Sequence, residues 1–123
     1  MDITMESLKL FDAEYRFMCI VWEKEPINST ELVKLCQSEF GWKKSTTYSV
    51  IKRLSERGVL KNENAVVTAL VQRIQVQKYE SEQLLEKAFD NSLPSFVAAF
   101  LQNKKLTQSE AEQIKKMIEE VTK

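Results

Sequence analysis

The fold of this chain is decided by residues 41–60, GWKKSTTYSVIKRLSERGVL. At helical spacing, one face of this stretch is mostly apolar and consists of Thr47, Val50, Ile51 and Leu54. The opposite face carries hydroxyls and cations, the groups that bond phosphates and base edges. Gly58 follows the last turn and can adopt the positive φ that ends a helix. The stretch predicts an amphipathic helix whose polar face suits DNA, with a merely solvated basic face as the alternative.

The charge of this stretch differs from that of the whole chain. Residues 41–61 hold six Lys or Arg against one acid, whereas the 123-residue chain has 18 basic and 18 acidic side chains and no net charge. DNA-binding proteins are usually basic as a whole. Positive charge confined to one helix gives modest non-specific affinity and places the potential where a groove would lie. We therefore interpret the charge as segregated onto the predicted helix.

The composition argues against several classes of protein. The chain has no His, the commonest general base and metal ligand, and no glycine-rich phosphate loop. We therefore expect no enzymatic activity, no cofactor and no metal site. Cys19 and Cys36 lie among apolar residues and are expected to be small buried thiols. No apolar run approaches the roughly 18 residues that span a bilayer, and no signal-peptide pattern is present, so we expect a cytoplasmic protein without membrane insertion.

Two further helices are predicted before residue 41. Residues 12–24 carry an apolar stripe at helical spacing, and Pro26 ends that helix. Asn28 is placed to cap a second helix over about residues 29–39. The short connection through Gly41 is typical of a helix-turn-helix.

The period changes from helix to strand after Gly58. Residues 59–61 and 66–71 flank the polar turn 62–65 and predict a β-hairpin. Three helices followed by a hairpin, with the third helix basic, form the plan of a winged helix. The turn is acidic to neutral, so we expect this wing to support the fold or touch a phosphate weakly rather than read bases.

Residues 72–123 are predicted to form three helices with apolar stripes. The first has roughly 18 residues, the second opens at Ser92 with Pro94 in its first turn, and the third follows a capping box of Thr107 and Glu110. Helices this small expose more apolar surface than they can bury among themselves, which predicts a two-fold dimer. Packing onto the N-terminal domain is the alternative. The expected interface residues are Tyr79, Leu85, Phe89, Leu93, Phe96, Val97, Phe100, Leu101, Ile114, Met117 and Ile118.

The order of these motifs resembles the penicillinase and methicillin-resistance repressor family, which also includes copper-responsive repressors. The resemblance covers about residues 10–120, and its landmarks are the opening LFDAEY at residues 10–15, Gly41-Trp42, Thr46-Thr47 and the segment 92–100. It implies a homodimeric winged-helix repressor that binds inverted-repeat operators. In the β-lactam branch of the family, repression ends when the repressor is cut in its dimerisation region after a membrane receptor senses the drug.

The chain departs from the family pattern at several positions. Phe11 stands where a Ser or Thr is usual, so Asp12 is expected to cap the first helix. Lys43-Lys44 replaces a Ser-Pro, and Tyr48 replaces an Arg. No cysteine follows Cys36, which excludes the paired C-x-C motifs of the copper branch.

The sequence thus predicts a mostly α fold, with a winged helix-turn-helix domain and small β-hairpin wing in residues 1–71 and a helical dimerisation domain in residues 72–123. We predict a homodimeric repressor of antibiotic-resistance-type genes that is inactivated by a membrane-receptor-linked protease. The bond aligned with the Asn-Phe cleavage site of the β-lactam branch is Ala99-Phe100. The residues expected to contact double-stranded operator DNA are Lys43, Lys44, Ser45, Thr46, Tyr48, Ser49, Lys52 and Arg53.

Three alternatives remain open at this point. Arg53 could pair with Glu56 or Glu14 and serve the fold. The protein could be a winged-helix regulator that binds a small molecule between its wing domain and its C-terminal helices. It could also be a helical adaptor or anti-repressor that binds protein and not DNA.

Overall fold

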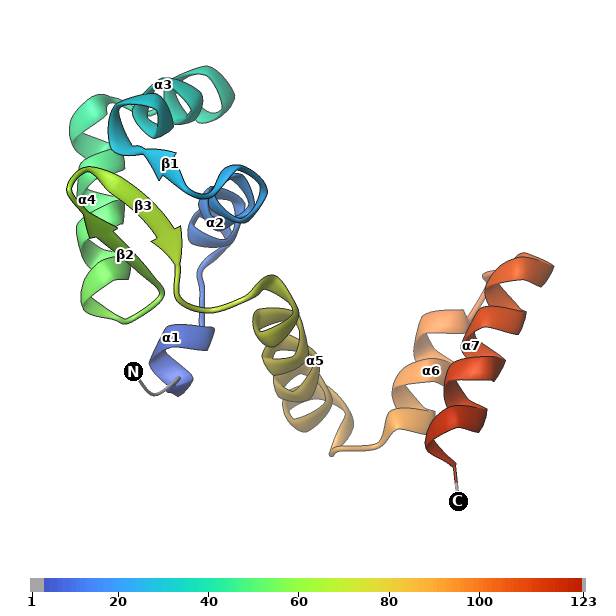
Figure 1. Cartoon of the computed structure of the whole chain (residues 1–123). Helices are drawn as coiled ribbons and strands as arrows, with labels where there is room; N and C mark the ends of the chain where they lie inside the picture. Colours follow the sequence, from blue (N-terminus) through green and yellow to red (C-terminus); the bar gives the residue numbers. More distant parts are fainter. Residues whose placement is uncertain (1–3, 123) are drawn as a thin grey trace. The chain divides into compact units, whose positions relative to one another are not determined.

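Figure 1 shows the computed structural model, which describes residues 4–122. By its internal packing the chain divides into two units, Met1–Gln83 and Leu84–Lys123. The division falls within helix α5 (Arg73–Phe89). The predicted functional boundary after Val71 stays a prediction. Within residues 4–122, no helix is both long and apolar enough to cross a membrane.

The first unit is a winged helix, as predicted. Its strands form a three-stranded antiparallel sheet in the order β1-β3-β2, with Ile27 opposite Val67 and Leu60 opposite Ala69. Strand β1 has only two residues and was not predicted. In chain order, the elements before α5 are α1 (Met5–Leu8), α2 (Asp12–Lys24), β1 (Ile27–Asn28), α3 (Ser29–Phe40), α4 (Lys44–Glu56), β2 (Leu60–Glu63) and β3 (Val66–Ala69).

The ends of the three main helices follow from a few residues. Asn28 caps α3 by accepting a hydrogen bond from the backbone N–H of Thr30 at 2.9 Å. Gly41, with a φ of 71°, ends α3 in the left-handed conformation, and Gly58 has a φ of 76° just after α4, as predicted. The expected capping role of Asp12 is wrong, because the N-cap of α2 is Phe11.

The core of the first unit lies between α2, α3, α4 and the sheet. Thr47, Val50, Ile51 and Leu54 are the buried residues of α4, which confirms the predicted inner face. Val76 of α5 is fully buried with them, so the first turn of α5 completes this core. Each fully buried aliphatic side chain stabilises the fold by about 1.5–3 kcal/mol. The other buried apolar residues are Phe17, Met18, Val21, Ile27, Leu32, Cys36, Val59, Leu60, Val67 and Val71.

The two cysteines occupy different environments in the first unit. Cys36 is buried, as expected, and burial raises the pKa of its thiol to about 11. Cys19 is only half-buried. Both are free thiols, and at neutral pH the Cys36 thiol stays protonated and behaves as a small apolar side chain.

The wing is short and is held against the segment before α3. Its turn consists of Asn64 and Ala65, whose φ angles of 53° and 63° are those of a tight hairpin turn. The predicted four-residue turn was too long, since residues 62 and 63 belong to β2. The carbonyl oxygen of Ala65 accepts a hydrogen bond from Ser29 N–H at 2.8 Å, and Ala69 N–H donates to Glu25 Oε1 at 2.9 Å. The wing is therefore tied to residues 25–29 at both of its ends.

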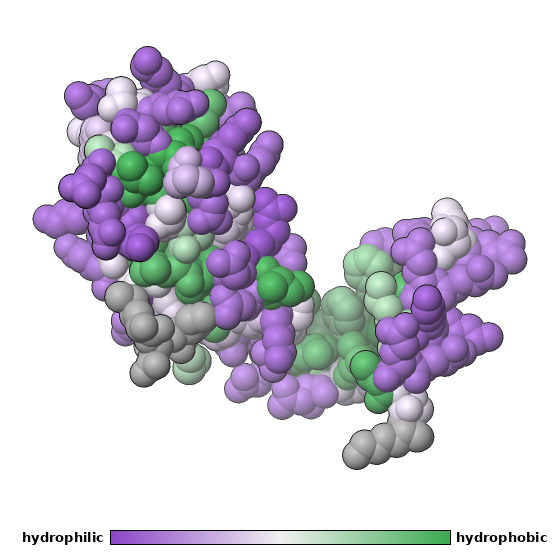
Figure 2. Space-filling model, in the orientation of Figure 1, coloured by the Kyte–Doolittle hydropathy of each residue, from purple (hydrophilic) through white to green (hydrophobic). Residues whose placement is uncertain are grey.

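The second unit holds the end of α5 and two helices, α6 (Leu93–Leu101) and α7 (Gln108–Val121) (Figure 1). Ser92 caps α6 by accepting from Ser95 N–H at 3.1 Å. Thr107 and Glu110 form the predicted capping box of α7. Neither α6 nor α7 buries a residue within the described chain, and Figure 2 shows apolar side chains gathered over α6.

Candidate nucleic-acid interface

The outer face of α4 presents hydroxyls and lysines to solvent. Its first turn contains no acidic residue, and no side chain caps it. The backbone N–H groups of that turn are therefore open to an anion, which the positive end of the helix dipole favours. The predicted residues that lie exposed along this face are Lys43, Lys44, Ser45, Thr46, Ser49, Lys52 and Arg53.

Tyr48 occupies a different position from the other predicted contact residues. It is half-buried and packs against the hydrophobic core. Its hydroxyl lies 3.4 Å from the Oγ of Ser29, at the start of α3. The ammonium of Lys44 lies 6.0 Å from the centre of its ring. Tyr48 therefore joins α4 to the first turn of α3 and to the wing that Ser29 anchors, a link that the spacing of residues in α4 could not reveal.

The buried carboxylate of Glu14, in α2, pairs with two arginines at the C-terminal end of α4. The side chain of Glu14 is only 2% exposed, and its Oε2 lies 2.9 Å from the Nε of Arg53 and 2.9 Å from the Nη1 of Arg57. Its Oε1 accepts hydrogen bonds from Phe11 N–H and from Arg57, both at 2.9 Å. The alternative pairing of Arg53 with Glu14 is therefore present, whereas the role of Arg57 was missed.

These partners decide the protonation of Glu14. Burial by itself raises the pKa of the carboxyl group, but the hydrogen bond from Phe11 N–H and the guanidinium groups of Arg57 and Arg53 outweigh it. The pKa of Glu14 consequently lies below its usual value, and the group is a carboxylate at neutral pH. The same hydrogen bond to Phe11 makes Glu14 the residue that satisfies the start of α2, which is why Asp12 is not needed there.

Arg57 also fastens the N-terminal segment to the end of α4. Its Nη2 donates to the carbonyl oxygen of Glu6 at 3.2 Å and to that of Lys9. These bonds join positions 48 and 51 residues apart in the sequence. The position of Arg57 just before Gly58 signals a helix end, but nothing in the sequence indicates these partners.

A hollow of about 380 Å³ lies beside α4, where Arg53 meets the hydroxyl groups. Ser45, Ser49 and Arg53 are spaced by four residues and therefore share one face of the helix. The hollow brings together four of the predicted contact residues. Its lining consists of Ala13, Glu14, Trp42, Ser45, Thr46, Ser49, Val50 and Arg53.

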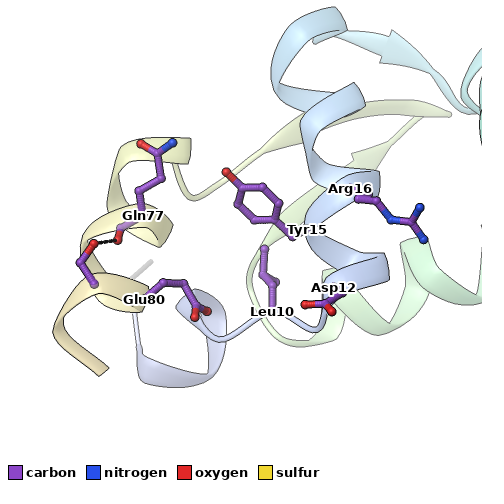
Figure 3. Close-up of a pocket in the computed structure, with 7 residues that line it drawn as sticks. Leu10, Asp12, Tyr15, Arg16, Gln77 and Glu80 are labelled. Atoms are coloured by element: carbon purple, nitrogen blue, oxygen red, sulfur yellow. Dashed lines mark hydrogen bonds between the residues drawn. The ribbon is translucent and has the colours of Figure 1, made fainter. Parts of the chain in front are cut away.

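A second, larger cavity of about 720 Å³ lies between α2 and the first half of α5 (Figure 3). The side chains of Leu10 and Tyr15 border its open space, together with the carboxylates of Asp12 and Glu80. Arg16 points away from it (Figure 3), and its guanidinium carbon lies 5.3 Å from the centre of the Phe40 ring. The lining of the cavity therefore combines an aliphatic and an aromatic side chain with one carboxylate from each of the two helices.

The predicted interface residues divide into two groups by exposure. Tyr79, Leu85, Phe89, Phe96 and Leu101 are half-buried, and the rings of Phe89, Phe96 and Phe100 follow one another with centres 5.5 and 5.9 Å apart. The exposed residues are Leu93, Val97, Phe100, Ile114, Met117 and Ile118.

The bond Ala99-Phe100 lies in the last turn of α6, with both residues exposed. The ammonium of Lys104 lies 4.1 Å from the centre of the Phe100 ring.

The chain is similar in sequence to known repressor and resistance regulatory proteins. The chain is 25% identical to the penicillinase repressor of Bacillus licheniformis, over 91% of each protein. It is 23% identical to the methicillin resistance regulatory protein MecI of Staphylococcus aureus strain Mu50, over 92% of this chain and 95% of that protein. A solution structure of the monomeric form of Bacillus licheniformis BlaI in complex with the blaP half-operator matches 55% of this chain and 87% of that one, with 25% identity and a TM-score of 0.49.

The profile of the penicillinase repressor family matches residues 10–120. The match includes α2, α3, α4, the wing and all three C-terminal helices. The chain therefore belongs to the penicillinase repressor family, whose members are DNA-binding transcriptional repressors and not enzymes.

Proposed function

We propose that this protein represses transcription by binding an inverted-repeat operator as a homodimer, with α4 of each protomer in a major groove. The observation that carries the proposal is the outer face of α4, where hydroxyls and lysines lie exposed over a fully buried inner face. A helix of this kind reads bases with its polar side chains and holds phosphates with its cations. Membership of a repressor family supports the same conclusion.

The roles of the individual side chains follow from their places on α4. Lys43 precedes α4, Lys44 is its first residue, and Arg53 lies in its last turn. These three cations would hold the DNA backbone. The side chains proposed to meet base edges and nearby phosphates are Ser45, Thr46, Tyr48, Ser49 and Lys52. Tyr48 contributes the least of these, because its ring packs on the core and its hydroxyl lies beside Ser29.

A second copy of the chain is the proposed partner of the C-terminal helices. The described residues of α6 and α7 bury no side chain in the single chain, and Phe100 remains 52% exposed and Met117 61% exposed. A soluble protein rarely leaves so continuous an apolar surface uncovered, and a two-fold axis covers it with an identical one. Two linked α4 helices would then meet the two halves of an inverted repeat.

We further propose that cleavage of Ala99-Phe100 by a receptor-linked protease ends repression of antibiotic-resistance-type genes. Both residues lie in the last turn of α6, where helices open most readily. A cut there separates Phe100 and α7 from the rest of the interface. Mass spectrometry of protein from induced cells should show a fragment ending at Ala99, and intact protein in derepressed cells would exclude this route.

The DNA-binding proposal is tested by selecting duplexes from a random pool with the full-length protein. Selected sequences should contain an inverted repeat whose half-sites are about one or two helical turns apart. Sedimentation should show one dimer bound to each duplex. A pool without a shared repeat, or no salt-dependent binding to any duplex, would refute the proposal and favour an adaptor that binds protein.

A small-molecule-responsive regulator is the second candidate, and the cavity between α2 and α5 favours it. Asp12 and Glu80 form no ion pair among the described residues, so their carboxylates and the Tyr15 ring suit a small organic cation. Amines bearing an apolar group should then raise the melting temperature of the wild type but not of Glu80→Gln. Equal shifts in both proteins would argue against this use of the cavity.

A further inference from the structure

Arg53 is held at one edge and free at the other. Its Nε donates to Glu14 Oε2 at 2.9 Å, and its side chain is 52% exposed. Among residues 4–122, no hydrogen bond joins its two terminal nitrogens to another atom of the chain. These two nitrogens belong to a planar group whose fork matches two oxygens of a phosphate.

Glu14 is fixed independently of Arg53. Both of its oxygens accept hydrogen bonds from Arg57 Nη1 at 2.9 Å, and Oε1 also accepts from Phe11 N–H. With only 2% of its side chain exposed, the carboxylate cannot swing outward with a mobile arginine. Glu14 therefore fixes the position of Arg53, and its own position does not depend on Arg53.

The ion pair between Arg53 and Glu14 contributes little to the stability of the fold. Arg57, whose side chain is only 22% exposed, already neutralises the single negative charge of Glu14. An ion pair with a half-exposed arginine adds little to the free energy of unfolding. The two arginines leave the cluster with one net positive charge, so it still attracts an anion.

Arg53 lines the hollow together with Ser45, Thr46 and Ser49. Three hydroxyl groups and a guanidinium around about 380 Å³ provide hydrogen-bond donors for anionic oxygens. The open backbone N–H groups of the first turn of α4 lie at the same end as Ser45 and Thr46.

We infer that Glu14 is a positioning residue, which orients Arg53 so that its two terminal nitrogens grip a DNA phosphodiester in this hollow. The inference rests on the proposed function and names one of its contacts. It assigns a part in DNA binding to a side chain that is buried and negatively charged, and that acts through Arg53.

The substitution Glu14→Gln distinguishes three roles of Glu14 by the sign of its effect on DNA affinity. If Glu14 positions Arg53, Glu14→Gln weakens DNA binding although it makes the protein more positive. If it acts only through its charge, the same change tightens binding. If it serves only the fold, affinity per folded molecule stays the same. Glu56→Gln is the matched control, because it removes an exposed carboxylate from α4, the helix that carries Arg53.

The experiment measures the dissociation constant of full-length variants for the best selected duplex over a series of KCl concentrations, well below each melting temperature. Affinity falls as salt rises, and Arg53→Gln should make this dependence less steep. The slope of log affinity against log salt should shrink in magnitude by about one unit for each protomer bound. Glu14→Gln should weaken binding at least about tenfold, and adding Arg53→Gln to it should change little further. Glu56→Gln should bind as tightly as the wild type or slightly tighter.

Two results would overturn the inference: folded Glu14→Gln that binds as tightly as the wild type, or additive effects in the double variant. Should Glu14→Gln fail to fold, Arg53→Lys decides, because it keeps the charge but lacks both the Nε anchor and the fork. It should bind like Arg53→Gln, and wild-type affinity would refute the phosphate grip. Lys44→Gln separates this inference from the proposed function: if neither Lys44→Gln nor Arg53→Gln alters the salt slope, α4 does not face DNA at all.

Discussion

Replacing Phe100 by Ser should convert the proposed dimer to monomers at micromolar concentration. Phe100 is 52% exposed in the single chain, so about half of its surface is uncovered. An aromatic side chain can bury about 200 Å², so roughly 100 Å² remains for a partner to cover. At about 25 cal/mol per Å², this surface contributes about 2.5 kcal/mol, and a two-fold interface counts it twice. The loss of about 5 kcal/mol corresponds to a dissociation constant raised by roughly 4,000-fold.

Sedimentation equilibrium over a range of protein concentrations measures this change directly. The matched control is Phe11→Ser, which removes a phenyl ring that is 70% exposed but belongs to the first unit. Circular dichroism should show unchanged helix content in both variants under the conditions of the measurement. The reasoning is refuted if Phe100→Ser dimerises as tightly as Phe11→Ser, or if the wild type is itself a monomer.

Three further predictions concern the first unit. Lys44→Gln should weaken binding to all duplexes alike, and the slope of log affinity against log salt should become less steep by about one unit per protomer. Fluorescence anisotropy measures both effects. A change confined to one sequence would contradict a phosphate contact. Because the pKa of Glu14 is lowered by folding, its stabilisation is complete above the ordinary pKa of a glutamate and is lost as the pH falls through the lowered value. Thermal unfolding should therefore show Glu14→Gln well below the wild type at about pH 7 and close to it at about pH 2, and a constant difference would disprove this linkage. Ala65→Gly should raise the melting temperature by several degrees, since a side chain at a φ of 63° costs about 1 kcal/mol; an unchanged or lower value would show that the turn is not strained.

The longer helices could be predicted because each leaves a repeated pattern in the sequence, whereas the four-residue helix α1 was not predicted. The inner face of α4 repeats every three to four residues and Gly58 follows its last turn, so its buried side and the glycine that closes it were both confirmed. Strand β1 has two residues, too few for any alternation, and it exists because β3 pairs with it. A strand that depends on its neighbour in this way leaves no local signal.

The candidate site was harder to predict where it depends on contacts distant in sequence. The hydroxyls and lysines of α4 could be assigned to its outer face from spacing alone. Spacing could not show that Tyr48 leans on Ser29, or that Arg57 reaches a carboxylate 43 residues earlier. The capping error at Asp12 has a similar origin, because a Glu three residues into a helix can satisfy the first amide without help from its neighbours.

The uncovered surfaces of α6 and α7 bear on how long the protein survives in a cell. No residue that the structure describes in these helices is buried by the chain itself, so their stability depends on whatever covers them. With a second copy as the cover, folding of these helices becomes a second-order process that follows protein concentration. Scarce molecules would be degraded faster than abundant ones, because unpaired helices open more often to proteases. The level of the repressor would then influence its own lifetime, and a fall in synthesis would deplete it more steeply than dilution alone.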